Sequence, residues 1–268
     1  MLALAYLPAA GVTRPLTLGV FPHLTPRQII TAYQPLVGAL EASLGREVAL
    51  VSAPDFKTFI TRTRHGDYDI VLTAPHLAWL AREDAGYRPL LKYANPPRAL
   101  LVVRADSSFD DLPALRGRAI ATSDSIALAV MEMQSQLARH ALERNRDYRV
   151  VEAGTHLNAA MQLIKGRADA AMVGLHPYEL MPHDLRQSLR VIAETPPVSS
   201  LAYLTHPRLR DTEVRAVRRA LLDFGATPAG RRFLRDGHYG AFAATDGHEI
   251  EAYRDHALRI RAMMQGDR

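Results

Sequence analysis

The chain has no cysteine, and this absence removes several classes of site at once. It excludes disulfides, thiolate metal ligands, a cysteine nucleophile and a lipid attached to an N-terminal cysteine. Long apolar runs are also missing: none approaches the roughly 20 residues of a membrane-spanning helix. Lysine is scarce, since only three of the 33 basic residues are lysine and the others are arginine.

The net charge of +5 does not point to nucleic acid. The arginines are interleaved with acids, as at Arg210, Asp211 and Glu213. No run alternates basic and aromatic side chains in the way of a single-strand-binding groove. We therefore expect a solvated, arginine-rich surface and no nucleic-acid partner.

The pattern of apolar residues predicts an α/β protein. Short apolar runs, typical of buried strands, alternate with longer amphipathic segments, as in a parallel sheet flanked by helices. Strands are predicted at 16–21, 48–52, 69–73, 99–104, 118–121, 148–153, 169–173, 189–194 and 201–204. Helices are predicted at 27–44, 55–64, 75–85, 112–115, 126–142 and 157–165. Pro35 should kink or divide the first of these, and the tail from Asp211 is expected to be helical without strand partners.

Two proline pairs suggest where the chain crosses between two lobes. Pro96–Pro97 and Pro196–Pro197 each precede a predicted strand. We expect lobe 1 to comprise residues 14–100 plus 203–268 and lobe 2 to comprise residues 101–202. Ligands of open α/β sheets lie beyond the carboxyl ends of the strands, so the two lobes should share a cleft.

Four histidines follow predicted strands at the end where this cleft is expected. They are His23 and His76 in one lobe and His156 and His176 in the other. Imidazole can donate a hydrogen bond to an oxyanion, and the neutral ring is a common transition-metal ligand. Each histidine alone also fits an ordinary polar turn, so all these interpretations remain open.

Motifs of catalysis are missing. There is no glycine-rich phosphate loop, no His-Glu-x-x-His and no Gly-x-Ser-x-Gly. Asp67 and Asp69 stand close together, but a turn followed by a strand explains them. The sequence therefore predicts neither an enzyme nor a cofactor. The apolar start, Met1 to Gly11, is interpreted as the incomplete remnant of a secretion signal or as a disordered leader.

Several longer segments carry a family resemblance. They are LTLGVFPHLTP (16–26), YQPLVGALEASLG (33–45), APDFKTFITRTRHGDYDIVLTAPH (53–76), VVRADSSFDDLPALRGRAIA (102–121), AGTHLNAAMQLIKGRADAAMVG (153–174) and FGATPAGRRFLRDGHYGAF (224–242). In this order and spacing, the chain resembles the phosphate/phosphite/phosphonate-binding proteins of bacterial ABC transporters over residues 16–265. The resemblance implies a two-lobed type II periplasmic-binding-protein fold, each lobe a mostly parallel sheet flanked by helices, with a two-strand hinge. It also implies a monomer exported to the periplasm, a small-molecule anion ligand and an ABC transporter permease as partner.

The resemblance implies a ligand set as well, with departures from the family pattern. Its Ser-Thr-Ser-Gly turn matches residues 122–127 here, where Asp124 adds a negative charge and the glycine is missing. A family tyrosine falls on Phe56, and an acid that holds aminoalkyl groups in some members falls near Leu201, so a zwitterionic aminophosphonate is not expected. Together with Arg98 at the expected crossing and the histidines that follow strands, the expected ligand-binding residues are His23, Phe56, His76, Arg98, Thr122, Ser125, Thr155, His156 and His176.

Two alternatives keep the fold and change the role. In one, His23, His76, His156 and His176 hold a transition metal or a metal chelate. In the other, the protein senses its ligand for a membrane kinase. Capture of a small oxyanion for an ABC importer by hinge closure is the leading hypothesis.

Overall fold

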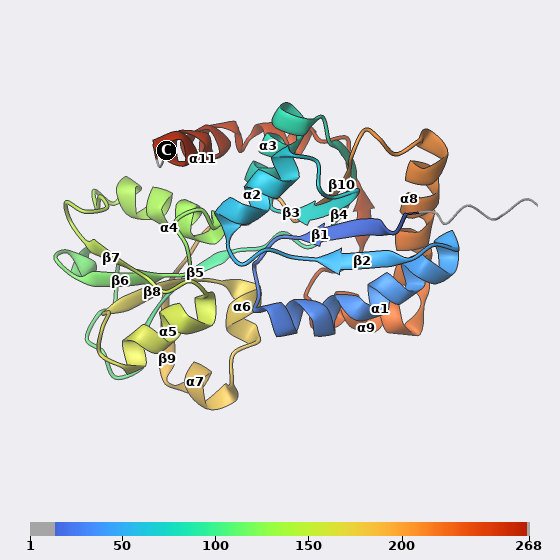
Figure 1. Ribbon diagram of the computed structural model, residues 1–268. Coiled ribbons are helices and arrows are strands. Elements are labelled where there is room, and N and C mark those ends of the chain that lie inside the picture. Colours follow the sequence, from blue (N-terminus) through green and yellow to red (C-terminus); the bar gives the residue numbers. More distant parts are fainter. Residues whose placement is uncertain (1–13, 267–268) are drawn as a thin grey trace, which may run out of the picture.

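The computed structural model describes residues 14–266, which form two lobes, each built on one β-sheet with helices on both faces (Figure 1). The two-lobed α/β architecture expected from the sequence is therefore confirmed. The expected signal remnant, Met1 to Gly11, lies outside the described residues. Among the described helices, none combines the length and the apolarity needed to cross a bilayer.

The first lobe contains a six-stranded sheet in the order β11-β4-β10-β3-β1-β2. Its strands are β1 (Leu16–Val20), β2 (Val48–Val51), β3 (Ile70–Thr73), β4 (Arg88–Tyr93), β10 (Ala202–Thr205) and β11 (Phe242–Ala244). Its helices are α1 (Pro26–Leu44), α2 (Phe56–Arg64), α3 (Pro75–Ala85), α8 (Asp211–Ala226), α9 (Pro228–Asp236), α10 (His248–Glu251) and α11 (Arg254–Gly266). Strands β1, β2 and β3 are parallel, whereas β10 is antiparallel to both β3 and β4.

The second lobe contains a five-stranded sheet in the order β7-β6-β8-β5-β9. Its strands are β5 (Ala99–Arg104), β6 (Ala119–Thr122), β7 (Arg149–Glu152), β8 (Ala170–Gly174) and β9 (Leu189–Glu194). Its helices are η1 (Pro113–Leu115), α4 (Leu128–Arg139), α5 (His156–Ile164), α6 (Leu175–Glu179) and α7 (His183–Gln187). Strand β5 is antiparallel to β8 and β9, so each sheet is more mixed than the expected mostly parallel arrangement.

The chain crosses between the sheets twice, and the crossing segments lie side by side. Residues 94–98 lead from β4 to β5, and residues 195–201 lead from β9 to β10. The Val198 N–H donates to the Pro97 carbonyl over 2.9 Å, and the Ala99 N–H donates to the Thr195 hydroxyl over 3.0 Å. We propose these segments as the hinge. The lobe boundaries expected from the sequence, 100/101 and 202/203, lie just inside β5 and β10.

The structure corrects two expectations about the elements. The tail is not purely helical, because β11 pairs with β4, and β4 was itself not predicted. Helix α1 continues through Pro35 without dividing. Its start is fixed by a capping box, in which the Thr25 hydroxyl and the Gln28 side chain each bond the other residue's backbone N–H.

The two lobes repeat one structural unit with an offset of 100 residues. Helices α2 and α5 each have nine residues, and Gly66 and Gly166 follow with φ of +72° and +64°, a backbone region that glycine adopts most readily. Three residues later, Asp69 and Asp169 precede a buried strand. In each lobe the aspartate carboxylate accepts a hydrogen bond from the backbone of a neighbouring strand over 2.8 Å.

The Asp69 carboxylate accepts more of the described hydrogen bonds than that of Asp169. The Asp69 side chain is fully buried, and it accepts hydrogen bonds from the Thr17 backbone and hydroxyl and from Arg14 and Arg208. Burial alone would raise the pKa of this carboxyl, but the Thr17 backbone N–H and the two guanidinium groups hold the pKa below its usual value. Asp69 therefore ties β1 to β3 and to the loop that follows β10.

Replacing Asp69 with alanine should lower the free energy of unfolding by about 3 kcal/mol, because a buried ion pair loses one partner and the Thr17 N–H loses its acceptor. Urea unfolding measures this change. Asp67→Ala is the matched control, since Asp67 is exposed two residues away. Equal losses in the two variants would contradict the assigned role of Asp69.

Candidate functional site

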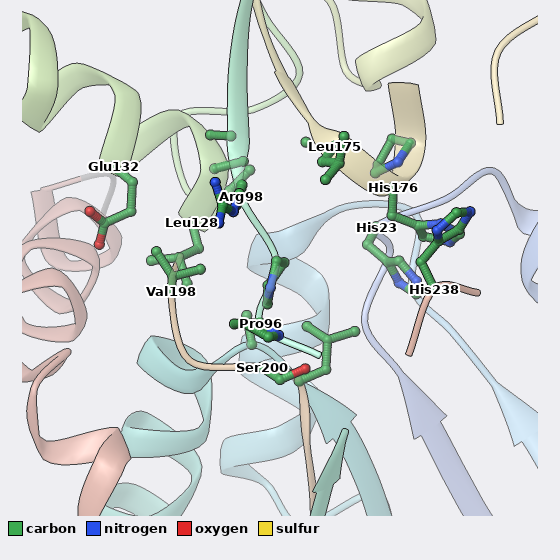
Figure 2. Close-up of a pocket in the computed structure, with 18 of the residues that line it drawn as sticks. His23, Pro96, Arg98, Leu128, Glu132, Leu175, His176, Val198, Ser200 and His238 are labelled. Carbon is green, nitrogen blue, oxygen red and sulfur yellow. The ribbon is translucent and has the colours of Figure 1, made fainter. Parts of the chain in front are cut away.

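A cavity of about 150 Å³ lies between the lobes. Residues of both lobes and of both crossing segments line it, and apolar side chains such as Phe21, Phe56, Leu128 and Val198 form much of the wall. A cavity of similar volume in another protein admits benzene, so this one suits a ligand of only a few heavy atoms. Figure 2 shows Arg98 in the middle of the lining, Glu132 on one side and a group of histidines on the other.

The starts of two helices, one from each lobe, also line the cavity. Ala74 and Pro75 belong to the start of α3, and Ala127, Leu128 and Ala129 belong to the start of α4. Neither helix has a side-chain cap, whereas Thr25, Asp55 and Thr155 cap α1, α2 and α5. First-turn N–H groups have no acceptor within their own helix. Helix α4 therefore brings unpaired Leu128 and Ala129 N–H groups and the positive end of its dipole to the cavity.

Four histidines meet at one end of the cavity: His23, His156, His176 and His238. Figure 2 shows three of them, His23, His176 and His238, side by side. The rings of His176 and His238 are 5.9 Å apart, and His238 Nε2 lies 3.2 Å from a carboxylate oxygen of Glu179. His238 belongs to the first lobe and Glu179 to the second, so this pair spans the mouth of the cleft.

Burial keeps three of these rings neutral at pH 7. It lowers the pKa of His23 to about 4, that of His156 to about 4 and that of His176 to about 3. His23 Nδ1 lies 2.9 Å from the Phe21 carbonyl oxygen, to which it must donate. Its Nε2 is then an acceptor, buried without a partner. In His156, Nδ1 accepts from the Gly174 N–H over 3.4 Å.

The structure brings together some of the residues expected from the sequence and separates others. His23, Phe56, Arg98, His156 and His176 all line the cavity. Arg98 is partly exposed there and pairs with Glu194 over 2.8 Å. His76 lies outside the cavity lining, fully buried between the lobes.

The three expected hydroxyl ligands also lie outside the cavity lining. Thr155 caps α5. The Ser125 hydroxyl bonds Glu152 and Arg144 of its own lobe, and the Thr122 hydroxyl is buried without a partner. Asp124, which seemed to bring charge to the site, instead accepts from the Ile126 N–H over 2.8 Å.

Sequence reasoning missed His238, Glu132 and Glu179 as lining residues. His238 follows α9 in a Gly-His-Tyr-Gly turn and reaches the cavity only because the tail folds back along β4. The two glutamates lie inside helices, where acids are ordinary surface residues. All three residues reach the cleft through contacts with segments that are distant in the sequence, so no local sequence pattern identifies them as lining residues.

Comparison with known proteins identifies related chains. Residues 18–250 match the model of a family described as the periplasmic substrate-binding protein of phosphonate ABC transporters. A search among curated proteins finds no match.

Solved structures show the same fold. A binding protein component of an ABC phosphonate transporter from Pseudomonas aeruginosa is 18% identical, with a TM-score of 0.83 over 93% of this chain and 87% of that one. PhnD1 from Prochlorococcus marinus, solved with methylphosphonate, is 13% identical, with a TM-score of 0.82 over 92% of this chain and 98% of that one. A Xanthomonas citri protein solved with ATP is 19% identical, with a TM-score of 0.76 over 93% of this chain and 99% of that one.

The buried histidines should make the protein less stable in mild acid. The pKa of His156 is about 4 in the folded protein and about 6.5 in an unfolded chain. Below pH 6.5 the unfolded chain therefore binds more protons, and stability falls by up to about 1.4 kcal/mol per pH unit. His156→Gln should reduce this slope in urea unfolding between pH 6.5 and 5 by the share of one histidine, whereas His65→Gln, at an exposed position, should not. A slope unchanged in His156→Gln would show that the ring is not held neutral.

Proposed function

The chain belongs to the periplasmic substrate-binding proteins of phosphonate ABC transporters, and we propose that its own ligand is a small oxyanion of the phosphonate, phosphite or phosphate class. The observation that carries the proposal is the uncapped start of α4 at the cavity. Unpaired N–H groups buried there need an acceptor, and an oxyanion supplies several. A carboxylate or phosphonate oxygen at this place also meets the positive end of the helix dipole.

The composition of the cavity wall supports a compact ligand with an apolar part. The volume of about 150 Å³ accommodates a phosphonate with a short alkyl group and is too small for a nucleotide. Phe56 and Leu128 provide apolar contact. Arg98, although paired with Glu194, is the cationic side chain placed to attract an anion to the cleft.

The histidines at one end of the cavity are polar partners for the ligand, and their protonation state can change when the ligand binds. A neutral imidazole offers one donor and one acceptor, and a bound anion raises the pKa of a nearby ring. His23 Nε2, buried without a partner, gains one from a protonated oxygen of the ligand, or takes up a proton and donates to an anionic oxygen. We place His23, His156 and His176 as ligand contacts on this basis.

Capture proceeds by closure of the two lobes about the crossing segments. Because both lobes line the cavity, the ligand makes its full set of contacts only when they approach, and it shifts the population toward the closed form. We further propose that the protein acts as a monomer in the periplasm, delivers its ligand to an ABC permease, and catalyses no reaction.

The metal alternative finds no support in the arrangement of side chains. Across residues 14–266, no group of three or more histidine, aspartate or glutamate side chains is placed to hold a metal ion. Of the four histidines expected to do so, His76 lies apart from the cavity that the other three line. No observation favours the kinase-linked role over transport.

A thermal-shift screen of metal-stripped protein at pH 7.5 tests the ligand class. Methylphosphonate, ethylphosphonate, phosphite or phosphate should raise Tm by several degrees at saturating concentration, since ligand that binds only the folded state stabilises it. Sulfate, alkylsulfonates, carboxylates, nickel and zinc complete the panel. If no oxyanion raises Tm, the proposed ligand class is falsified. If only the metals raise Tm, metal binding by the histidines becomes the better hypothesis.

An acid placed at the start of α4 should abolish capture without unfolding the protein. Ala129→Asp puts a carboxylate beside the unpaired N–H groups, where it satisfies the helix itself. Methylphosphonate affinity, measured by calorimetry, should fall more than tenfold because two anions then compete for one site. Asn158→Asp adds the same charge to the first turn of α5 at an exposed position and should change affinity little. Unaltered binding in Ala129→Asp would remove α4 from the site.

A further inference from the structure

His76 occupies the place in the first lobe that His176 occupies in the second, yet the two side chains have different surroundings. Each is the second residue of the helix that follows a buried strand, β3 or β8. His176 lines the cavity. His76 has no exposed surface and lies outside the cavity lining. The His76 ring therefore contacts neither the ligand nor the solvent, and its role has to be sought in its contacts within the protein.

The hydrogen bond of His76 crosses from one lobe to the other. Its Nε2 lies 2.9 Å from the carbonyl oxygen of Ile126, and because a carbonyl only accepts, Nε2 donates. Ile126 directly precedes Ala127, the N-cap residue of α4, and the Asp124 carboxylate holds the Ile126 N–H. The bond therefore connects the start of α3 to the loop that sets the start of α4.

We propose that His76 is a positioning residue which, in its neutral form only, holds the start of α4 against the first lobe when the protein closes. The proposal rests on the closure and anion capture described above and adds to them a contact that does not touch the ligand. A neutral imidazole needs one N–H, and Ile126 accepts it. A protonated ring carries a second N–H on Nδ1, an atom that is buried without a partner in this structure.

Burial is the main reason why His76 resists protonation. Burial, together with a smaller effect of His256 of α11, lowers the pKa of His76 to about 3. Glu132 of α4 faces His256, 3.4 Å from its Nε2, and the Asp124 carboxylate bonds the Ile126 backbone. Apolar residues of both lobes, including Trp79 and Leu128, share one buried cluster here. The ring is enclosed because the lobes meet.

Closure is consequently linked to proton release. In an open form the ring meets water, and its pKa returns to an ordinary value of about 6.5. Between pH 6.5 and about 3 the open form binds a proton that the closed form lacks, so acid favours opening. Above pH 6.5 both forms are neutral at His76, and the contact contributes fully.

The test compares wild type with His76→Gln, whose amide places an N–H near the position of Nε2 and does not titrate. Methylphosphonate is the probe, and calorimetry at pH 7.5, 6.5 and 5.5 gives the dissociation constants. The ratio of wild-type to His76→Gln constants should rise about tenfold from pH 7.5 to 5.5. This ratio cancels the ionisation of the probe and of the cavity histidines. His76→Ala should bind more weakly than His76→Gln at every pH, and exposed His65→Gln should follow the wild type.

A ligand-free measurement separates failure of this proposal from failure of the proposed function. Because the chain has no cysteine, spin labels on Arg27→Cys of α1 and Asp184→Cys of α7, both exposed, report the distance between the lobes. Acidification from pH 7.5 to 5.5 should increase the open fraction in wild type more than in His76→Gln. Identical pH profiles for the two proteins, in distance or in affinity, would overturn the role of His76 even if methylphosphonate binds.

A measurement on the wild type decides the matter if His76→Gln does not fold. The His76 ring, identified by nuclear Overhauser contacts to Ile126, should stay neutral to below pH 5 in the ligand-saturated protein and titrate closer to pH 6.5 in the open form. A ring with the same pKa in both states contradicts the proposal.

Discussion

The first-turn N–H groups of a buried helix must have acceptors, and this requirement organises the protein. At the starts of α1, α2 and α5 the side chain of Thr25, Asp55 or Thr155 provides an acceptor. Helix α4 begins at the cleft without such a side chain. Its unpaired groups persist because the cavity leaves room for an acceptor from outside the chain. The start of α4 thus offers donors that a bound ligand can satisfy.

The unit that the two lobes repeat has the same backbone arrangement in both but carries different side chains at the cleft. Asp69 and Asp169 secure the same strand connection in each lobe, so the strands end at matching places. The residues at those ends have diverged. Phe56 supplies an apolar wall where the second lobe has His156, and His76 joins the lobes where the second lobe directs His176 to the cavity. Similar backbones thus bring different side chains to the cleft.

The sequence predicts the fold well where each element carries its own signals, and less well elsewhere. Helix α2 is recognisable from Asp55 at its start and Gly66 at its end. Strand β4, with Pro89 and Lys92 in it, lacks a strand pattern and was missed. The strand-end rule predicts that His23, His156 and His176 come near the cleft, because it depends only on topology. It cannot distinguish His76 from His176, since burial of His76 depends on contacts across the cleft. His238 escapes prediction because the tail carries it back to β4.

The two crossing segments have a further consequence. Because 94–98 and 195–201 run side by side, the whole second lobe is a single uninterrupted stretch of chain whose two ends are neighbours. Such a piece is an insertion that starts and finishes at one point of its host. It can be exchanged between relatives as a cassette, with both joints made at this point and the host sheet left intact. Recombination could therefore give this scaffold a different second lobe while the lobe that carries Asp69 is inherited unchanged.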